Sequence, residues 1–315
     1  MTLSLNKIDI RSFCKAHRKA LITTAFLILI VILILLIPAF AINEKGMEDK
    51  CKGMIDVIFS GGLTDSVKDI VLANPTTKYS AAWNIMVNVY KTVLLPIGFA
   101  LLSLHLVIGI VQQSIKLDQL TAQQFLKPFL LFIVGFMVVK NGLTILCYMI
   151  NIAQGIVNEM TIGSEAAMST MIAKANLLVE NEVDGMITGF VLMIQLFLPW
   201  AAALILGVAV KVVCYTRIFE LYLKTMLAPL GMCDVVTKGL DSNGLRFFKN
   251  YLATCLQGVV IVGISIIYSS ILGSVISGST ETTILGMAGT ALVMGFAALS
   301  MMMKAGSITK EVLGA

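Results

Sequence analysis

The chain has few charged residues and few of the residue patterns that carry catalysis. Asp, Glu, Lys and Arg together make up 13% of it, against about a quarter in ordinary soluble domains. Histidine occurs twice, and the sequence contains no His-Glu-x-x-His pair, no Gly-x-Ser-x-Gly elbow and no phosphate-binding loop. The composition therefore excludes a soluble globular domain. We expect no enzymatic activity, no cofactor and no metal site.

Hydrophobic residues, by contrast, account for 58% of the chain and are gathered into runs of about 20 residues. That length lets a helix cross a hydrocarbon layer of roughly 30 Å. In lipid the backbone must satisfy its own hydrogen bonds, and the runs lack the two-residue alternation of barrel strands. The sequence therefore predicts an all-α, polytopic integral membrane protein.

Six apolar runs are long enough to span, and the charges between them predict their orientation. With the N-terminus inside, the inner segments carry 15 Lys and Arg against 6 Asp and Glu, and the outer ones carry 6 against 12. The positive-inside rule thus favours six spans in the cell membrane, with a cytoplasmic C-terminus. The spans are 21–37, 92–111, 129–150, 186–210, 252–276 and 284–303; the inner segments are 1–20, 112–128, 211–251 and 304–315, and the outer ones are 43–82, 158–185 and 277–283.

The first run has two interpretations, both covering residues 1–42. A basic stretch, an apolar core of 17 residues and then Pro38-Ala39-Phe40-Ala41 are typical of a signal peptide with a small-x-small cleavage site. The core is longer than such peptides usually have, which favours a retained signal anchor. Cleavage would leave five spans and an outer N-terminus.

The segment 217–236 is apolar but contains Arg217, Glu220 and Lys224. A charged residue at the centre of a spanning helix costs about 3 kcal/mol on insertion scales. We therefore predict a re-entrant or interfacial helix on the cytoplasmic side, within 217–250, that Pro229 breaks. The spacing places the three charges on one helix face, either as a compensated ladder at an interface or gate, or as a solvated stripe.

Polar and small residues occur inside other spans. Lys140 lies past the midplane of the third span, where it either extends outward to the interface or lines a polar cavity. His105, in the second span, is either a proton relay or a hydrogen-bond donor in helix packing. The fifth span carries small residues at intervals of four, which form a flat face for a helix of the same chain or of a neighbouring subunit. They are Ser265, Ser269, Gly273 and Ser277.

Two stretches together resemble the TrbL-like family, the polytopic membrane subunits of conjugative type IV secretion systems, in the form carried by Gram-positive mobile elements. They are Trp83-Asn-Ile-Met-Val-Asn-Val-Tyr-Lys-Thr-Val-Leu-Leu-Pro-Ile-Gly98 and Arg217-Ile-Phe-Glu-Leu-Tyr-Leu-Lys-Thr-Met-Leu-Ala-Pro-Leu-Gly231. The resemblance runs over 83–303, with an outer loop at 158–184. The polar segment 43–82 and the tail 304–315 lie outside the resemblance.

The resemblance implies a channel subunit that scaffolds or lines the route of DNA transfer. It implies a homo-oligomeric ring in the lipid bilayer, contacts with cytoplasmic ATPases and an extracellular assembly factor, and a transient DNA–relaxase substrate. A secondary transporter or permease for a small solute is the alternative, but such proteins often show related halves, and no convincing internal repeat is visible here. A scaffold without a pore is a third interpretation.

Overall fold

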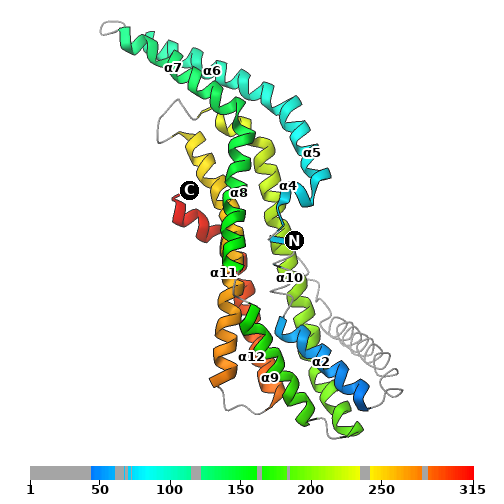
Figure 1. Ribbon diagram of the computed structural model, residues 1–315. Coiled ribbons are helices and arrows are strands. Elements are labelled where there is room, and N and C mark those ends of the chain that lie inside the picture. Colours follow the sequence, from blue (N-terminus) through cyan, green and yellow to red (C-terminus); the bar gives the residue numbers. More distant parts are fainter. Residues whose placement is uncertain are drawn as a thin grey trace, which may run out of the picture.

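The computed structural model consists of helices throughout the residues that it describes (Figure 1). These residues are 44–60, 67, 70–71, 73–114, 122–161, 165–182, 185–234, 242–278 and 283–315. The first apolar run, and with it the question of a signal anchor or signal peptide, lies outside them. The elements are α2 (Glu44–Ser60), α4 (Pro75–Lys78), α5 (Ser80–Val89), the π-helical turn η2 (Tyr90–Leu94), α6 (Leu95–Ser114), α7 (Ala122–Lys140), α8 (Gly142–Thr161), α9 (Glu165–Glu182), α10 (Met186–Met232), α11 (Asn243–Gly278) and α12 (Ile284–Leu313).

The prediction of a polytopic all-α membrane protein is confirmed. Within the described residues, four helical stretches are long and apolar enough to cross a membrane, and a fifth crossing is possible if a bent pair of helices counts as one span. Each of the five predicted spans within the described residues has its counterpart. The four are Ser80–Gln112, Ile187–Met232, Asn243–Ile276 and Ile284–Leu313, and the bent pair is Pro128–Lys140 with Gly142–Met160.

Helix α10 corrects one prediction. We expected a span ending near 210 and a separate re-entrant helix from 217, broken at Pro229. Instead α10 runs unbroken for 47 residues with Pro199 and Pro229 inside it, a length of about 70 Å. A proline removes a single backbone hydrogen bond, and Pro229 lies only three residues before the helix ends. Segment 217–232 is thus the continuation of the fourth span, and it does not turn back.

The third span is bent by 59° at Asn141, between α7 and α8. The side chain of Asn141 donates a hydrogen bond to the carbonyl of Met137 (3.0 Å). A Cβ on the next residue, Gly142, would lie 2.6 Å from Met232 Sδ and 3.0 Å from Tyr90 Oη. A larger residue would require the Met232 side chain to shift, so the bend is packed directly against the end of α10.

Helix α6 begins with a second local irregularity. Pro96 has no backbone N–H, so it cannot complete the usual bond to the carbonyl of Thr92. The π-helical turn Tyr90–Leu94 immediately precedes it. Such turns absorb a missing donor without ending the helix, and here α5, η2 and α6 form one continuous apolar stretch.

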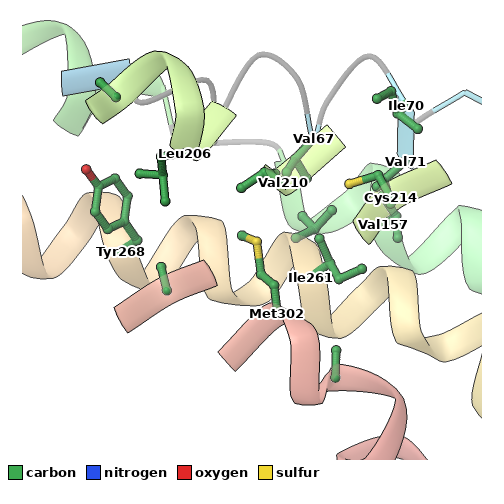
Figure 2. Close-up of a cluster of buried hydrophobic side chains, with 14 of the residues drawn as sticks. Val67, Ile70, Val71, Val157, Leu206, Val210, Cys214, Ile261, Tyr268 and Met302 are labelled. Carbon is green, nitrogen blue, oxygen red and sulfur yellow. The ribbon is translucent and has the colours of Figure 1, made fainter. Parts of the chain in front are cut away.

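The core lies where α8, α10, α11 and α12 pack together (Figure 2). Leu206, Val210 and Cys214 of α10 face Ile261 of α11 and Met302 of α12, and all five are buried. Between helices in lipid, close packing takes the place of the hydrophobic driving force available in water. The long helices are therefore held in one bundle by side-chain contact along their length.

The segments predicted from charge to lie on opposite sides of the membrane are found largely at opposite ends of the molecule (Figure 1). The α6–α7 hairpin and the adjoining ends of α10 and α11 lie at one end of the molecule, at the top of the picture. Helices α2 and α9 lie at the other, with the start of α10, the end of α11 and the start of α12. The segments assigned to the cytoplasm thus lie largely at one end, and those assigned to the outside largely at the other.

Helix α9 links several elements at that second end. Lys174 donates a hydrogen bond to the carbonyl of Ile276 at the end of α11 (3.0 Å), and Glu182 accepts one from the N–H of Ile284 at the start of α12 (3.4 Å). Each charge has the sign that the nearby helix terminus favours. Lys52 of α2 pairs with Glu180 of α9 at 2.6 Å. These contacts fasten α9, and through it α2, to the helix bundle.

Candidate functional site

Arg217, in the second half of α10, is the charged residue buried deepest in the described bundle. Its Nε donates a hydrogen bond to the carbonyl of Thr254 (3.3 Å), and its Nη2 donates one to the carbonyl of Cys255 (3.0 Å). Both carbonyls belong to α11. The guanidinium is therefore held between two helices by backbone dipoles, and these two bonds involve no carboxylate.

Gly258 of α11 provides the space for this arrangement. A Cβ at this position would overlap Cζ and both Nη atoms of Arg217. The long side chain could move aside only by giving up its bonds to the two carbonyls. Arg217 and Gly258 thus fit each other as a pair across the α10–α11 contact.

We predict opposite effects of alanine at two helical glycines. Gly258→Ala should displace the guanidinium and lower stability by about 1–3 kcal/mol, since a buried charged donor would lose its partners. Gly155→Ala in α8 is the matched control, because nothing lies within 4 Å of its added Cβ. That change should be neutral or stabilise by up to about 1 kcal/mol through helix propensity. Unfolding of the detergent-purified proteins measures both, and equal stability of the two variants would contradict the steric argument.

Glu220 and Lys224 form a separate pair one turn further along α10. Lys224 Nζ lies 2.7 Å from Glu220 Oε1, donates a hydrogen bond to Thr254 Oγ1 (2.6 Å) and reaches the carbonyl of Asn250 (3.4 Å). The Thr254 hydroxyl lies 3.5 Å from the same Glu220 oxygen. Glu220 and Lys224 are partly exposed, so the direct attraction between them contributes roughly 0–1 kcal/mol.

The ladder suggested by the sequence is therefore corrected in one respect. Glu220 and Lys224 pair as their spacing predicts, but Arg217 extends to the carbonyls of α11. The arginine side chain is long enough for its guanidinium to extend away from Glu220 and bond the backbone of the neighbouring helix α11. Thr254 is the residue that the two parts share, through its carbonyl and its hydroxyl.

The two stretches that carry the resemblance lie against each other. The rings of Trp83 and Tyr222 meet edge to face at 5.7 Å between centroids. A Cβ on Gly98 would lie 2.8 Å from Pro229 Cβ and 3.0 Å from its carbonyl oxygen. The Tyr222 hydroxyl also donates a hydrogen bond to the carbonyl of Pro75 (2.6 Å). Residues 75–98 therefore lie alongside the last turns of α10, from Tyr222 to Pro229.

The contact between Trp83 and Tyr222 changes the expected position of the second span along the axis of α10. The sequence placed residues up to 82 outside and residues from 211 inside, yet Trp83 touches Tyr222. The second span thus starts beside the C-terminal half of α10 and is staggered along it. Charge balance cannot reveal such a stagger, because it reports on which side a loop lies and gives no information on the depth of a helix.

His105 has a carboxylate nearby. Its Nε2 lies 3.8 Å from Oδ1 of Asp234, just beyond the end of α10, so the two form an ion pair when the imidazole is protonated. Asp234 also accepts a hydrogen bond from Asn243 (3.1 Å). Asp234 follows the end of α10 and lies far from His105 in the sequence, so the apolar run around His105 gave no sign of this partner.

The other singled-out residues lie in different places. Lys140 is exposed at the end of α7, and its role stays a prediction. Ser265 and Ser269 are buried within the chain, and a Cβ on Gly273 would lie 3.5 Å from Met171 Sδ of α9. The side chain of Ser277 lies outside the described part. At three of the four positions the small-residue face therefore packs inside the molecule.

One protein-family model matches the part of the chain that contains Arg217, Glu220, Lys224 and the Gly98–Pro229 contact. The family model described as TrbL/VirB6 plasmid conjugal transfer like protein matches residues 63–229, more than half of the chain. The chain belongs to this family. No curated protein and no solved structure matches the chain. The match begins upstream of Trp83 and ends at Pro229, so it includes both stretches up to the Gly98–Pro229 contact and leaves α11 and α12 outside.

Membership identifies the chain as a multi-pass membrane component of a type IV secretion, or conjugal transfer, apparatus, which works with other subunits of that apparatus. The family is one of conjugal transfer subunits, and the described residues contain no group of three or more His, Cys, Asp or Glu side chains placed to hold a metal ion. In this TrbL/VirB6-like chain, the side chains of Arg217 and Lys224 on α10 are hydrogen-bonded to α11, which lies outside the family match.

Proposed function

We propose that this chain scaffolds or lines the route of conjugative DNA transfer as a ring of identical copies in the cell membrane. Cytoplasmic ATPases would dock at the end formed by α10 and α11, and an extracellular assembly factor at the end formed by α2 and α9. A DNA–relaxase complex would be the transient substrate.

The Arg217 contact is the observation that carries this proposal beyond family membership. A membrane protein retains a buried cation at a cost, and such residues usually serve function. Here the cation joins a helix that the family model matches to a helix outside the match. The family segment is thus fixed to α11, which supports one rigid assembly unit per copy.

Recovery of transferring DNA distinguishes lining from scaffolding. Donor cells carrying a tagged chain are treated with formaldehyde during mating, and the DNA that co-purifies with the chain is quantified. A lining subunit should yield the transferred strand, and a donor without relaxase serves as the control that should yield none. Normal transfer from a donor that lacks the chain would refute the proposed function altogether.

Accessible cysteines test the proposed orientation. In a cysteine-free background, Asp49→Cys in α2 should react with an impermeant thiol reagent added to intact cells, while Asn243→Cys at the start of α11 should react only after lysis. Both positions are exposed. The adjoining Ser242 is unsuitable, because it is buried and its Oγ accepts the N–H of Leu245 (3.1 Å). Labelling of Asn243→Cys from outside would invert the predicted cytoplasmic side.

A further inference from the structure

An apolar stripe on α10 is largely exposed; near its C-terminal end, its Tyr215 ring also contacts Tyr79 of the same chain, at 6.4 Å between centroids. Its members repeat at alternating intervals of four and three residues, which is 3.5 on average, so they stay on one face of the helix. Nine are exposed and Ala201 is half-buried. We call them the α10 seam: Ile187, Val191, Ile194, Leu198, Ala201, Ile205, Val208, Val212, Tyr215 and Phe219.

The exposed apolar face is too long for lipid alone to cover. It continues past Phe219 through Leu223 to Leu227, so it extends about 60 Å along the helix. Even at a tilt of 40°, the upper end of the usual range, it would rise about 46 Å through a hydrocarbon layer of about 30 Å. Part of the face therefore lies outside the hydrocarbon, where exposed apolar side chains call for contact with protein.

Gln195 lies beside the seam, is exposed, and borders Val191, Ile194 and Leu198. Its amide carries donors and acceptors that hydrocarbon cannot satisfy. A second amide at the same level meets both needs, and a second copy of this helix supplies one. On the other flank, Lys211 is exposed on a stem long enough to hold its ammonium clear of a neighbouring helix.

We propose that neighbouring copies of this chain pack together through the α10 seam, with their α10 helices parallel and Gln195 hydrogen-bonded across the contact. The inference rests on the proposed function and deepens it, since it assigns the surface through which copies meet. A repeat of 3.5 residues suits helices that cross at about 20° and wind around each other to the left.

Site-specific photo-crosslinking tests the seam. A benzophenone amino acid replaces Leu198 or Val208 in the seam, or Ile267 on α11 as an exposed apolar control. Two differently tagged copies are expressed together, and membranes are irradiated. We expect a cross-linked dimer carrying both tags from Leu198 and Val208, and none above background from Ile267.

A second variant isolates the amide. Gln195→Leu should reduce the dimer yield about three- to tenfold, the range expected for loss of a hydrogen bond between membrane helices. Gln112→Leu, which removes an exposed amide from the end of α6, should leave the yield unchanged. Equal yields from these two variants would overturn the role of Gln195.

Other products would overturn the seam itself. Adducts to lipid alone at Leu198 and Val208, or a product within one chain such as one to the apolar run 21–37, would mean that no second copy covers this face. The crosslinking needs no transfer apparatus, so its failure leaves the transfer experiment standing. A donor that transfers DNA normally without the chain would refute the function and leave seam crosslinks unaffected.

Discussion

Arg217→Met is expected to lower DNA transfer to the level of a donor that lacks the chain, while the protein stays as stable as the wild type or becomes more stable. The guanidinium is buried and bonded to backbone carbonyls. Those carbonyls belong to α11 and retain their helical bonds when the side chain is removed. Methionine is similar in length and does not carry the desolvation cost of a buried charge. Replacing buried ionic groups with apolar ones is often neutral or stabilises by about 1–4 kcal/mol.

Two measurements separate stability from function here: mating frequency, and thermal unfolding of the purified chain. Arg217→Lys serves as the control, because it keeps the charge but cannot bond both carbonyls with a planar fork. We expect it to transfer DNA at an intermediate frequency. Normal transfer by Arg217→Met would show that the apparatus does not use the buried cation.

The second large effect is expected at Gly98. An added methyl group would lie 2.8 Å from Pro229 Cβ and 3.0 Å from its carbonyl oxygen, and the carbonyl belongs to the helix backbone. Relief requires α6 to move away from α10, so Gly98→Ala should destabilise the protein by about 1–3 kcal/mol, a typical cost of overpacking.

Gly109 provides the matched control within the same helix. Its added Cβ would meet only Pro128 Cβ, at an ordinary 3.8 Å. Gly109→Ala should therefore stabilise by up to about 1 kcal/mol through helix propensity alone. Denaturant unfolding in detergent should give opposite signs for the two substitutions. The same sign for both would mean that Gly98 is not confined by α10.

The apolar runs predicted the four single-helix spans in the described residues, and the bent pair where it counts as one crossing, because span length follows directly from bilayer thickness. The continuity of α10 was not predicted from the sequence. Pro229 and the three charged residues before it indicated a break, whereas the packing of the second half of α10 against α11 keeps the helix continuous. Spacing also predicted the Glu220–Lys224 pair, which is local. The partners of Arg217 and of Gly98 lie on other helices, and no pattern along one segment specifies which helix will lie opposite.

The Gly98–Pro229 contact has a consequence for synthesis of the chain. Pro229 leaves the ribosome about 130 residues after Gly98, which is roughly 7 to 26 s later at 5–20 residues per second. During that interval the α5–α6 segment has already been made and can pack against α7, but the end of α10 that Trp83 and Gly98 contact does not yet exist. A nascent chain shortened before Pro229 should therefore still present Trp83 and Gly98 to insertion factors, and release from these factors should follow completion of α10.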